Sequence, residues 1–321
     1  MRLASIEVAT PVGPQRRVGV VDGEELIDVH AAYAAALAAD GEADPTAIAD
    51  AHTPPEMIEF LKRGDRALAG ARRAVEYAGE TDESRGPTGG RLRFDPDEEG
   101  VELLAPVPRP NSLRDFMVFE EHVKNALGED PPDVWYEMPV YYKSNADSAV
   151  GTGADVEWPA YSDLMDYELE LAAVIGKQGT DISAADADEY IAGYTVFNDF
   201  SARDIQGQEM QGRLGPAKGK DFANAFGPYL VTADSFDPET ATMRAEVDGE
   251  VWSEGTAGEM YHSFADIIEH VSQSETLYPG DVLGSGTVGE GCGLELGQFL
   301  AAGDTVRLHV EGIGTLENTV R

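Results

Sequence analysis

Over the first 28 residues, apolar side chains occur in short runs separated by turn residues. The runs cover residues 3–9, 17–21 and 26–28, and Asp22-Gly23 between the last two is a common hairpin turn. Runs this short, bounded by turn residues, are typical of β-strands. We therefore predict an antiparallel hairpin meander at the N-terminus.

Alanine-rich segments with helical periodicity follow the meander. Apolar residues recur every three to four positions over 30–39 and 54–77, and Thr53-Pro54 is a helix start signal. Residues 79–100 are polar and contain several glycines and prolines, which predicts a loop. The first part of the chain is thus expected to combine strands with helices.

Three closely spaced prolines, Pro106, Pro108 and Pro110, mark a boundary. Such prolines hold a chain extended and stiff, as in linkers. A chain of 321 residues is long enough for one large domain or two unequal ones. We predict a small N-terminal α+β domain over residues 1–105 and a larger domain over 106–321.

Short strand-like runs dominate the larger domain, and few helices interrupt them, chiefly over 184–191 and 264–272. The predicted strands are residues 169–176, 192–198, 229–232, 243–247, 281–286 and 305–310. Their spacing is irregular, and the helices are too few for alternating βαβ units. We predict an α+β fold, mostly β, with an antiparallel or mixed β-roll or sandwich, and not a Rossmann fold.

Two carboxylates stand one residue apart in one of these runs. In a strand, Glu168 and Glu170 point to the same face, while Leu169, Leu171 and Ala173 occupy the other. Carboxylates held this close repel each other unless a proton or a cation lies between them. A hard divalent ion with oxygen ligands is the simplest interpretation, and an acidic, solvated edge strand is the alternative.

Two further acids stand beside predicted elements. Asp199 follows directly on a predicted strand, and Asp115 lies shortly after the proline-rich boundary. Each also fits the N-cap of a helix, over 201–210 and up to residue 127 respectively, because Asp is a common helix cap. The local sequence leaves both interpretations open.

The charge balance is strongly acidic, with 60 Asp and Glu against 23 Lys and Arg and a formal net charge of −37. Such a surface repels phosphate, which argues against nucleic acid and anionic membranes as partners. Acidic residues occur throughout the chain, a distribution typical of adaptation to concentrated salt. We expect a halophilic origin.

The single cysteine, Cys292, excludes an intrachain disulfide framework and a cysteine-based zinc cluster. The N-terminal residues lack the basic and apolar regions of a signal peptide, and no apolar stretch approaches 18 residues. These features predict a cytoplasmic protein.

Taken together, these segments resemble the fumarylacetoacetate hydrolase superfamily. The strongly acidic composition resembles that of a haloarchaeal-type member. The resemblance covers nearly all of residues 103–321. The motifs are DFxxFExH at 115–122, DxELE at 166–170, NDFSARDIQ at 198–206, GPAKGKDF at 215–222, PGDV at 279–282 with GT at 286–287, and AGD at 302–304 leading to EGIG at 311–314. The resemblance implies that family's β-roll domain, and commonly a homodimer.

The resemblance also implies a metal site. Glu168, Glu170 and Asp199 would be the divalent-metal ligands, with Asp115 as a fourth or neighbouring carboxylate. The ion would be Mg²⁺ in the first place, with Mn²⁺ or Ca²⁺ as alternatives, because these hard ions prefer oxygen ligands. In the family such an ion binds two oxygens of a 2-oxo acid or 1,3-dicarbonyl substrate.

The remaining site residues also come from the resemblance. His122 matches the catalytic histidine, Glu295 looks like its orienting carboxylate, and Lys220 would place positive charge near the reacting carbonyl. The residues that resemble substrate-contacting positions are Arg203, Gln206, Gly286 and Thr287. Without the resemblance, an exposed helix histidine and a solvated acid are the simpler interpretations of His122 and Glu295.

The expected function is metal-dependent hydrolysis of a C–C bond in an acylpyruvate or related β-diketo acid, of the fumarylacetoacetate type, during catabolism. Met117 and Met210 stand where fumarylacetoacetate hydrolase itself has tyrosines, so other substrates remain open. The alternatives are a 2-oxo-3-deoxy sugar acid dehydratase, a 2-hydroxydienedioate isomerase and a 2-oxopentenoate hydratase. A binding module with a structural metal is the non-enzymatic alternative.

The charge predicts that salt stabilises the protein. Potassium chloride screens the mutual repulsion of the carboxylates, so the free energy of unfolding should rise with ionic strength. Each kcal/mol gained would raise the Tm by about 2 °C in thermal unfolding. Sodium chloride at equal ionic strength is the control and should act similarly. Highest stability in low salt would contradict the halophilic interpretation.

Overall fold

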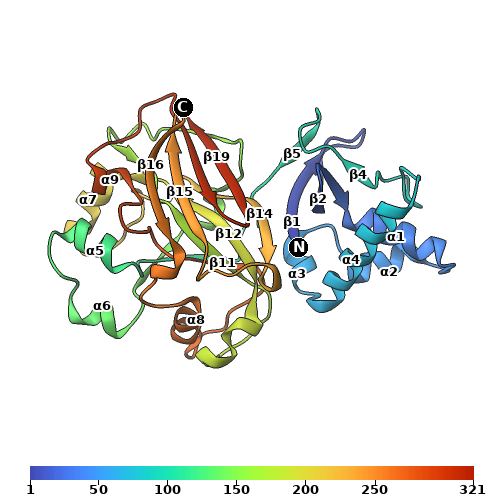
Figure 1. The fold of residues 1–321 in the computed structure, drawn as a ribbon, viewed down its shortest axis with the longest axis horizontal. Coiled ribbons are helices and arrows are strands. Elements are labelled where there is room, and N and C mark those ends of the chain that lie inside the picture. The colour runs from blue at the N-terminus through green and yellow to red at the C-terminus, as the bar shows by residue number, and fades with distance from the viewer.

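The computed structural model describes residues 1–321, and Figure 1 shows two unequal parts. A larger, strand-rich part carries the C-terminus. A smaller part contains the N-terminal strands and the helices α1 to α4 beside them (Figure 1). The fold is mixed α/β and rich in strands, which confirms the predicted class.

The N-terminal meander is confirmed. Strands β1 (Arg2–Val8), β2 (Gln15–Asp22) and β3 (Glu25–Asp28) pair antiparallel in sequence order. The short strands β4 (Arg93–Phe94) and β5 (Val101–Leu103) join β3 and β1. Residues 79–100 are therefore mostly loop, as expected, with one short strand.

The N-terminal helices differ in part from the prediction. They are α1 (Val29–Ala39), α2 (Pro45–His52), α3 (Met57–Leu61) and α4 (Asp65–Glu80). The single helix predicted over 54–77 is divided because Gly64, at φ +53°, lies in the left-handed region and interrupts the helical backbone. The sequence interpretation missed α2, which begins with a proline in its first turn.

The larger part contains the remaining strands, which include all six predicted runs, although the run predicted over 229–232 begins at Asn224. The sequence interpretation missed the others, among them the seven-residue strands over 250–256 and 314–320. The strands of this part are β6 (Ser112–Phe116), β7 (Tyr141–Ser144), β8 (Ala149–Val150), β9 (Asp155–Val156), β10 (Met165–Asp166), β11 (Glu170–Ile175), β12 (Ile191–Asp199), β13 (Ser201–Ala202), β14 (Asn224–Thr232), β15 (Thr242–Val247), β16 (Glu250–Thr256), β17 (Asp281–Gly284), β18 (Thr305–Val310) and β19 (Gly314–Val320).

The helices of this part are short. They are α5 (Glu120–Leu127), α6 (Asp133–Glu137), α7 (Arg203–Gln211), α8 (Phe264–Ser272) and α9 (Gly293–Leu296). The segment over 184–190, predicted as a helix, is a 3₁₀ helix. No helix of the protein combines the length and the apolar character needed to cross a membrane.

Two sheets form the framework of the fold. A 12-stranded mixed sheet runs in the order β4-β3-β2-β1-β14-β12-β11-β17-β6-β7, with β5 and β8 pairing at its side. The second sheet has the order β16-β15-β18-β19-β9. Because β1 pairs antiparallel with β14, the N-terminal meander extends the central sheet. The domain division at residue 105 stays a prediction.

Alternate residues of β11 enter two different cores. Leu171, Ala173 and Ile175 pack in the cluster that includes the five-stranded sheet, whereas Ala172 and Val174 pack in the cluster that includes the N-terminal helices. This follows from the two-residue period of a strand. By the same period Glu170 lies on the face of Ala172, beyond the end of the apolar core.

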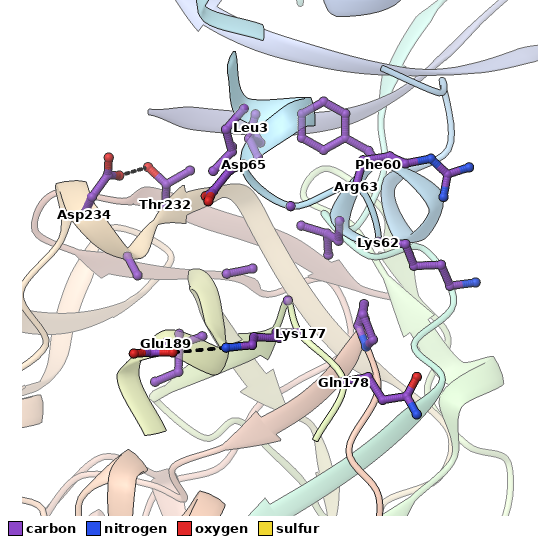
Figure 2. A pocket seen from close by; sticks show the side chains of 18 of the residues that line it. Leu3, Phe60, Lys62, Arg63, Asp65, Lys177, Gln178, Glu189, Thr232 and Asp234 are labelled. Carbon is purple, nitrogen blue, oxygen red and sulfur yellow. Dashed lines mark hydrogen bonds and ion pairs between the residues drawn. The ribbon is translucent and has the colours of Figure 1, made fainter. Parts of the chain in front are cut away.

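A cavity of about 920 Å³ lies between the N-terminal part and the central sheet. Figure 2 shows Phe60 and Asp65 on one wall and Lys177, paired with Glu189, on the other. The second wall is built where β11 and β14 end and β12 begins. None of the predicted site residues lines this cavity, and Glu170 and Asp199 lie at the opposite ends of β11 and β12.

Candidate metal centre and catalytic pair

Four carboxylates from separate segments meet at one end of the central sheet. Asp115 lies in β6, Glu168 precedes β11, Glu170 begins β11, and Asp199 ends β12. One oxygen from each lies within 4.8 Å of the others, and all four residues are buried. The structure therefore brings together the four predicted metal ligands. The alternative interpretation of Glu168 and Glu170 as acids on a solvated edge strand is wrong, because both are buried.

Neither Asp115 nor Asp199 caps a helix. The helix after Asp115 begins only at Glu120, and Ala202 is the N-cap of α7. Both aspartates are strand residues whose neighbours pair in the central sheet. Gly284 makes room for this arrangement, because a Cβ atom there would lie 2.5 Å from Asp115 Oδ1.

Burial and mutual repulsion govern ionisation in this cluster. Burial, with the nearby Asp199 charge, raises the pKa of Asp115 to about 8, and burial raises the pKa of Asp199 to about 6. Burial and the Asp115 charge also raise the pKa of Glu170 well above its usual range. Burial also acts to raise the pKa of Glu168, but the positive charges of Lys220 and Arg203 outweigh this effect, so the pKa of Glu168 is lowered.

The donor set fits a hard divalent cation. Asp115 Oδ1 and Asp199 Oδ1 are buried and have no hydrogen-bond partner. Together with the nearby Asp166, five buried carboxylates face only two buried cations, Arg203 and Lys220, which leaves a formal excess of three negative charges. A cation bound by carboxylate oxygens satisfies both the unpaired atoms and the charge.

Lys220 and Arg203 contact the predicted ligands directly. Lys220 Nζ lies 2.6 Å from Glu168 Oε2 and 2.7 Å from Asp199 Oδ2. Arg203 Nη1 lies 2.8 Å from Glu168 Oε1 and donates to Gln206 Oε1 at 3.0 Å. The two cations therefore fix the orientation of the carboxylates, and their predicted contacts with substrate remain predictions.

Gly286 and Thr287 also lie at the cluster. The Gly286 amide donates to Glu170 Oε2 at 3.1 Å, and the Thr287 hydroxyl donates to Glu170 Oε1 at 3.3 Å. Both follow β17, whose last residue makes room for Asp115. Their role as substrate-contacting groups stays a prediction.

His122 and Glu295 form a pair beside the carboxylates. His122 Nδ1 lies 2.8 Å from Glu295 Oε2, and the side chains are 9% and 1% exposed. Burial opposes ionisation of Glu295, but hydrogen bonds from His122 and Asn125 outweigh it and lower its pKa. The simpler interpretations, an exposed histidine and a solvated acid, are therefore wrong.

The pair comes from two short helices. His122 lies on α5 and Glu295 on α9, two helices that contact each other. Figure 1 shows both at the side of the larger part that faces away from the N-terminal helices. The Glu290 amide adds a donor to Glu295 Oε1 at 3.0 Å, which further supports the ionised carboxylate.

Sequence reasoning missed three residues that hold the cluster. The Tyr142 hydroxyl donates to Asp199 Oδ2, and Asn198 Oδ1 accepts the Glu168 amide at 3.0 Å. Asp166 accepts Arg203 Nε at 2.8 Å and the Gly293 amide at 2.7 Å. The alternation of Asp166 with Glu168 and Glu170 is a signal that could have identified Asp166, whereas no local pattern indicates Tyr142.

The chain is similar in sequence to proteins of one family. A family model described as fumarylacetoacetate (FAA) hydrolase C-terminal matches residues 112–321. The chain is 34% identical to the mitochondrial oxaloacetate tautomerase FAHD2A of Homo sapiens, over 100% of this chain and 91% of the human protein. It is 33% identical to the oxaloacetate tautomerase YisK of Bacillus subtilis, over 83% of this chain and 87% of that protein.

The fold is also similar to solved structures of two hydrolases. Fumarylacetoacetate hydrolase from Exiguobacterium antarcticum has a TM-score of 0.71 and 26% identity, covering 99% of both chains. Maleylpyruvate hydrolase from Sphingobium, in complex with manganese(II) and pyruvate, has a TM-score of 0.69 and 25% identity, covering 100% of this chain and 98% of the other.

The buried carboxylates predict that metal binding stabilises the protein more at high pH. Because the folded-state pKa values of Asp115 and Asp199 are raised, the folded metal-free protein binds extra protons between about pH 4 and pH 8. Its stability therefore falls as pH rises through that window. Mn²⁺ or Mg²⁺ displaces these protons, so its affinity should rise by about tenfold per pH unit for each proton displaced. Calorimetric titration and thermal unfolding near pH 6 and pH 8.5 measure this.

Glu170→Gln provides the matched test. Glutamine resembles the protonated glutamate, so metal-free stability should change little while metal affinity falls at least about tenfold. Glu189→Gln, at an exposed acid, is the control and should bind metal normally. Unchanged metal content and affinity in a Glu168→Gln, Glu170→Gln double variant would overturn the metal assignment.

Proposed function

Because the chain belongs to the fumarylacetoacetate hydrolase family of enzymes, we propose that it is a divalent-metal-dependent tautomerase of oxaloacetate or a closely similar 2-oxo dicarboxylate. The observation that carries this proposal is the buried His122–Glu295 pair beside the four carboxylates. Similarity to oxaloacetate tautomerases over the whole chain supports this choice of substrate.

The hydrogen-bond partners define the state of the base. Glu295 is ionised, so it can only accept hydrogen bonds, and His122 Nδ1 must carry the proton that the two share. In the neutral imidazole with this tautomer, Nε2 carries the lone pair that can accept a proton from substrate. Glu295 stabilises the positive charge that develops on the imidazole ring.

The reaction requires only a proton to move within the substrate. His122 Nε2 takes a proton from C3 of the keto form, and a proton is returned to the oxygen at C2, giving the enol with no other atom gained or lost. A single base that exchanges its proton can serve both steps. The reverse sequence converts the enol into the keto form.

Asp115, Glu168, Glu170 and Asp199 would hold the divalent ion. When bound, Mg²⁺, or Mn²⁺ or Ca²⁺ in its place, supplies a Lewis acid that polarises the 2-oxo group. Lys220 and Arg203 hold Glu168 in place and contribute positive charge near an anionic substrate. Gln206 and Thr287 touch groups of this cluster and are the proposed substrate contacts with Gly286.

Hydrolysis of a C–C bond in an acylpyruvate is the second candidate. The same His122–Glu295 pair supports it, because a buried base can also take a proton from water that attacks a carbonyl. One water is consumed, the C–C bond breaks, and the proton returns to the leaving carbon. The hydrolases of similar fold support this reading.

We also propose a setting for the enzyme. Its excess of 37 negative charges supports work in a salt-rich cytoplasm, where screening relieves self-repulsion. We propose that its substrate is a small anion used in catabolism. We also propose that the enzyme is a homodimer joined through the strand-rich part.

His122→Ala should lower kcat/KM for oxaloacetate tautomerisation by at least about 100-fold, because general base catalysis contributes roughly 10²- to 10⁴-fold. The assay follows loss of enol absorbance with metal and potassium chloride present, after subtraction of the spontaneous rate. Glu295→Gln should lower the rate in the same direction. His30→Ala is the matched control, because His30 pairs with Asp50 at the same 2.8 Å in the N-terminal part.

The same panel includes an acylpyruvate and a 2-oxo-3-deoxypentonate. Cleavage of the acylpyruvate that depends on His122, without faster tautomerisation of oxaloacetate, would replace the tautomerase by the hydrolase. Turnover of the sugar acid alone would favour a dehydratase. Full activity of His122→Ala on every substrate would overturn the proposed base.

A further inference from the structure

The only cysteine of the chain lies against the catalytic pair. Cys292 is buried, and its Sγ donates to Glu295 Oε2 at 3.3 Å, the same oxygen that pairs with His122 Nδ1. One donor atom from each of the three residues lies within 4.8 Å of the others. Burial raises the pKa of the Cys292 thiol, which makes it a poor nucleophile, and the proposed reaction gives it no task.

The two clusters differ in chemistry, and the second is a mixed set of donors, not the cysteine-based zinc cluster that a single cysteine excludes. The four carboxylates offer only oxygen, which suits hard ions, whereas this triad offers sulfur, nitrogen and oxygen, which suit zinc. We propose that His122, Cys292 and Glu295 form a second metal site that takes Zn²⁺ or another thiophilic divalent ion and thereby inhibits the enzyme.

Distance and charge favour this site. Tetrahedral zinc with bonds of about 2.0–2.3 Å separates its ligand atoms by roughly 3.3–3.8 Å. The donor atoms already lie close to such spacing, so small side-chain shifts suffice. Zinc displaces the thiol proton to solvent, and Zn²⁺ with one thiolate, one carboxylate and a neutral imidazole has no net charge, which suits a buried place.

Binding at this triad disables the proposed base. Zinc on His122 Nδ1 replaces the proton there, which moves to Nε2, and zinc on Glu295 removes the acceptor that orients the ring. The nitrogen proposed as the base is then protonated and can no longer accept a proton. The backbone bridge between Cys292 and Glu168 places the triad next to the carboxylate cluster, which can keep its own ion. The metal site itself is independent of the proposed function, and only the inhibition rests on it.

Cobalt(II) tests the site directly. With excess Mg²⁺ on the carboxylates, added Co²⁺ should give a thiolate-to-cobalt charge-transfer band in the near ultraviolet, with one equivalent bound per chain. The oxygen ligands of the carboxylate cluster cannot produce this band. Cys292→Ser and Cys292→Ala should lack it, and thermal unfolding checks that both variants fold. Absence of the band in the wild type, or its survival in either variant, would overturn the site.

Zinc titration of activity tests the inhibition. At saturating Mg²⁺, zinc should inhibit the wild type, and Cys292→Ser should need at least about tenfold more zinc, each compared with its own zinc-free rate. Serine can still donate to Glu295, so it isolates the sulfur. Equal zinc sensitivity of the wild type and both variants would overturn the inhibition and assign it to the carboxylates. A cobalt band without zinc inhibition would keep the metal site and count against His122 as the base.

Discussion

The repulsion among buried carboxylates is the constraint on which the rest of the site depends. Asp115, Glu170 and Asp199 have raised pKa values because the sheet removes them from water and holds them together. Lys220 and Arg203 compensate only part of the charge, and the unpaired Asp115 and Asp199 oxygens show where compensation is missing. The fold stabilises this arrangement through packing elsewhere, so that a cation can complete it.

In the central sheet, the middle of a strand packs in the apolar cores and its end carries a carboxylate of the candidate site. Residues 171–175 of β11 alternate between two apolar cores, and Glu170 at the start of the same strand lies beyond them. β12 repeats the pattern in the opposite direction, with Asp199 at its end. Antiparallel pairing brings these two strand ends together, and both strands are buried over almost their whole length.

Local patterns in the sequence were sufficient to predict part of the fold and part of the candidate site. The period of two predicted the shared face of Glu168 and Glu170, and turn residues predicted the N-terminal meander. They could not decide between strand and cap for Asp115 and Asp199, because aspartate favours caps, is uncommon in strands, and is placed in a strand here only by sheet pairing. Family resemblance supplied the pair of His122 with Glu295, since no local rule connects residues 173 positions apart.

The environment of Glu295 supports its proposed role as the residue that orients the base, not as the base itself. Its two oxygens accept from His122, Asn125, the Glu290 amide and the Cys292 thiol. Several donors stabilise the carboxylate and lower its pKa, so it holds a proton poorly. The proposed proton transfer is therefore assigned to the imidazole of His122. Because tautomerisation and hydrolysis both begin with such a transfer, the same pair suits either reaction, and the groups that contact substrate must distinguish them.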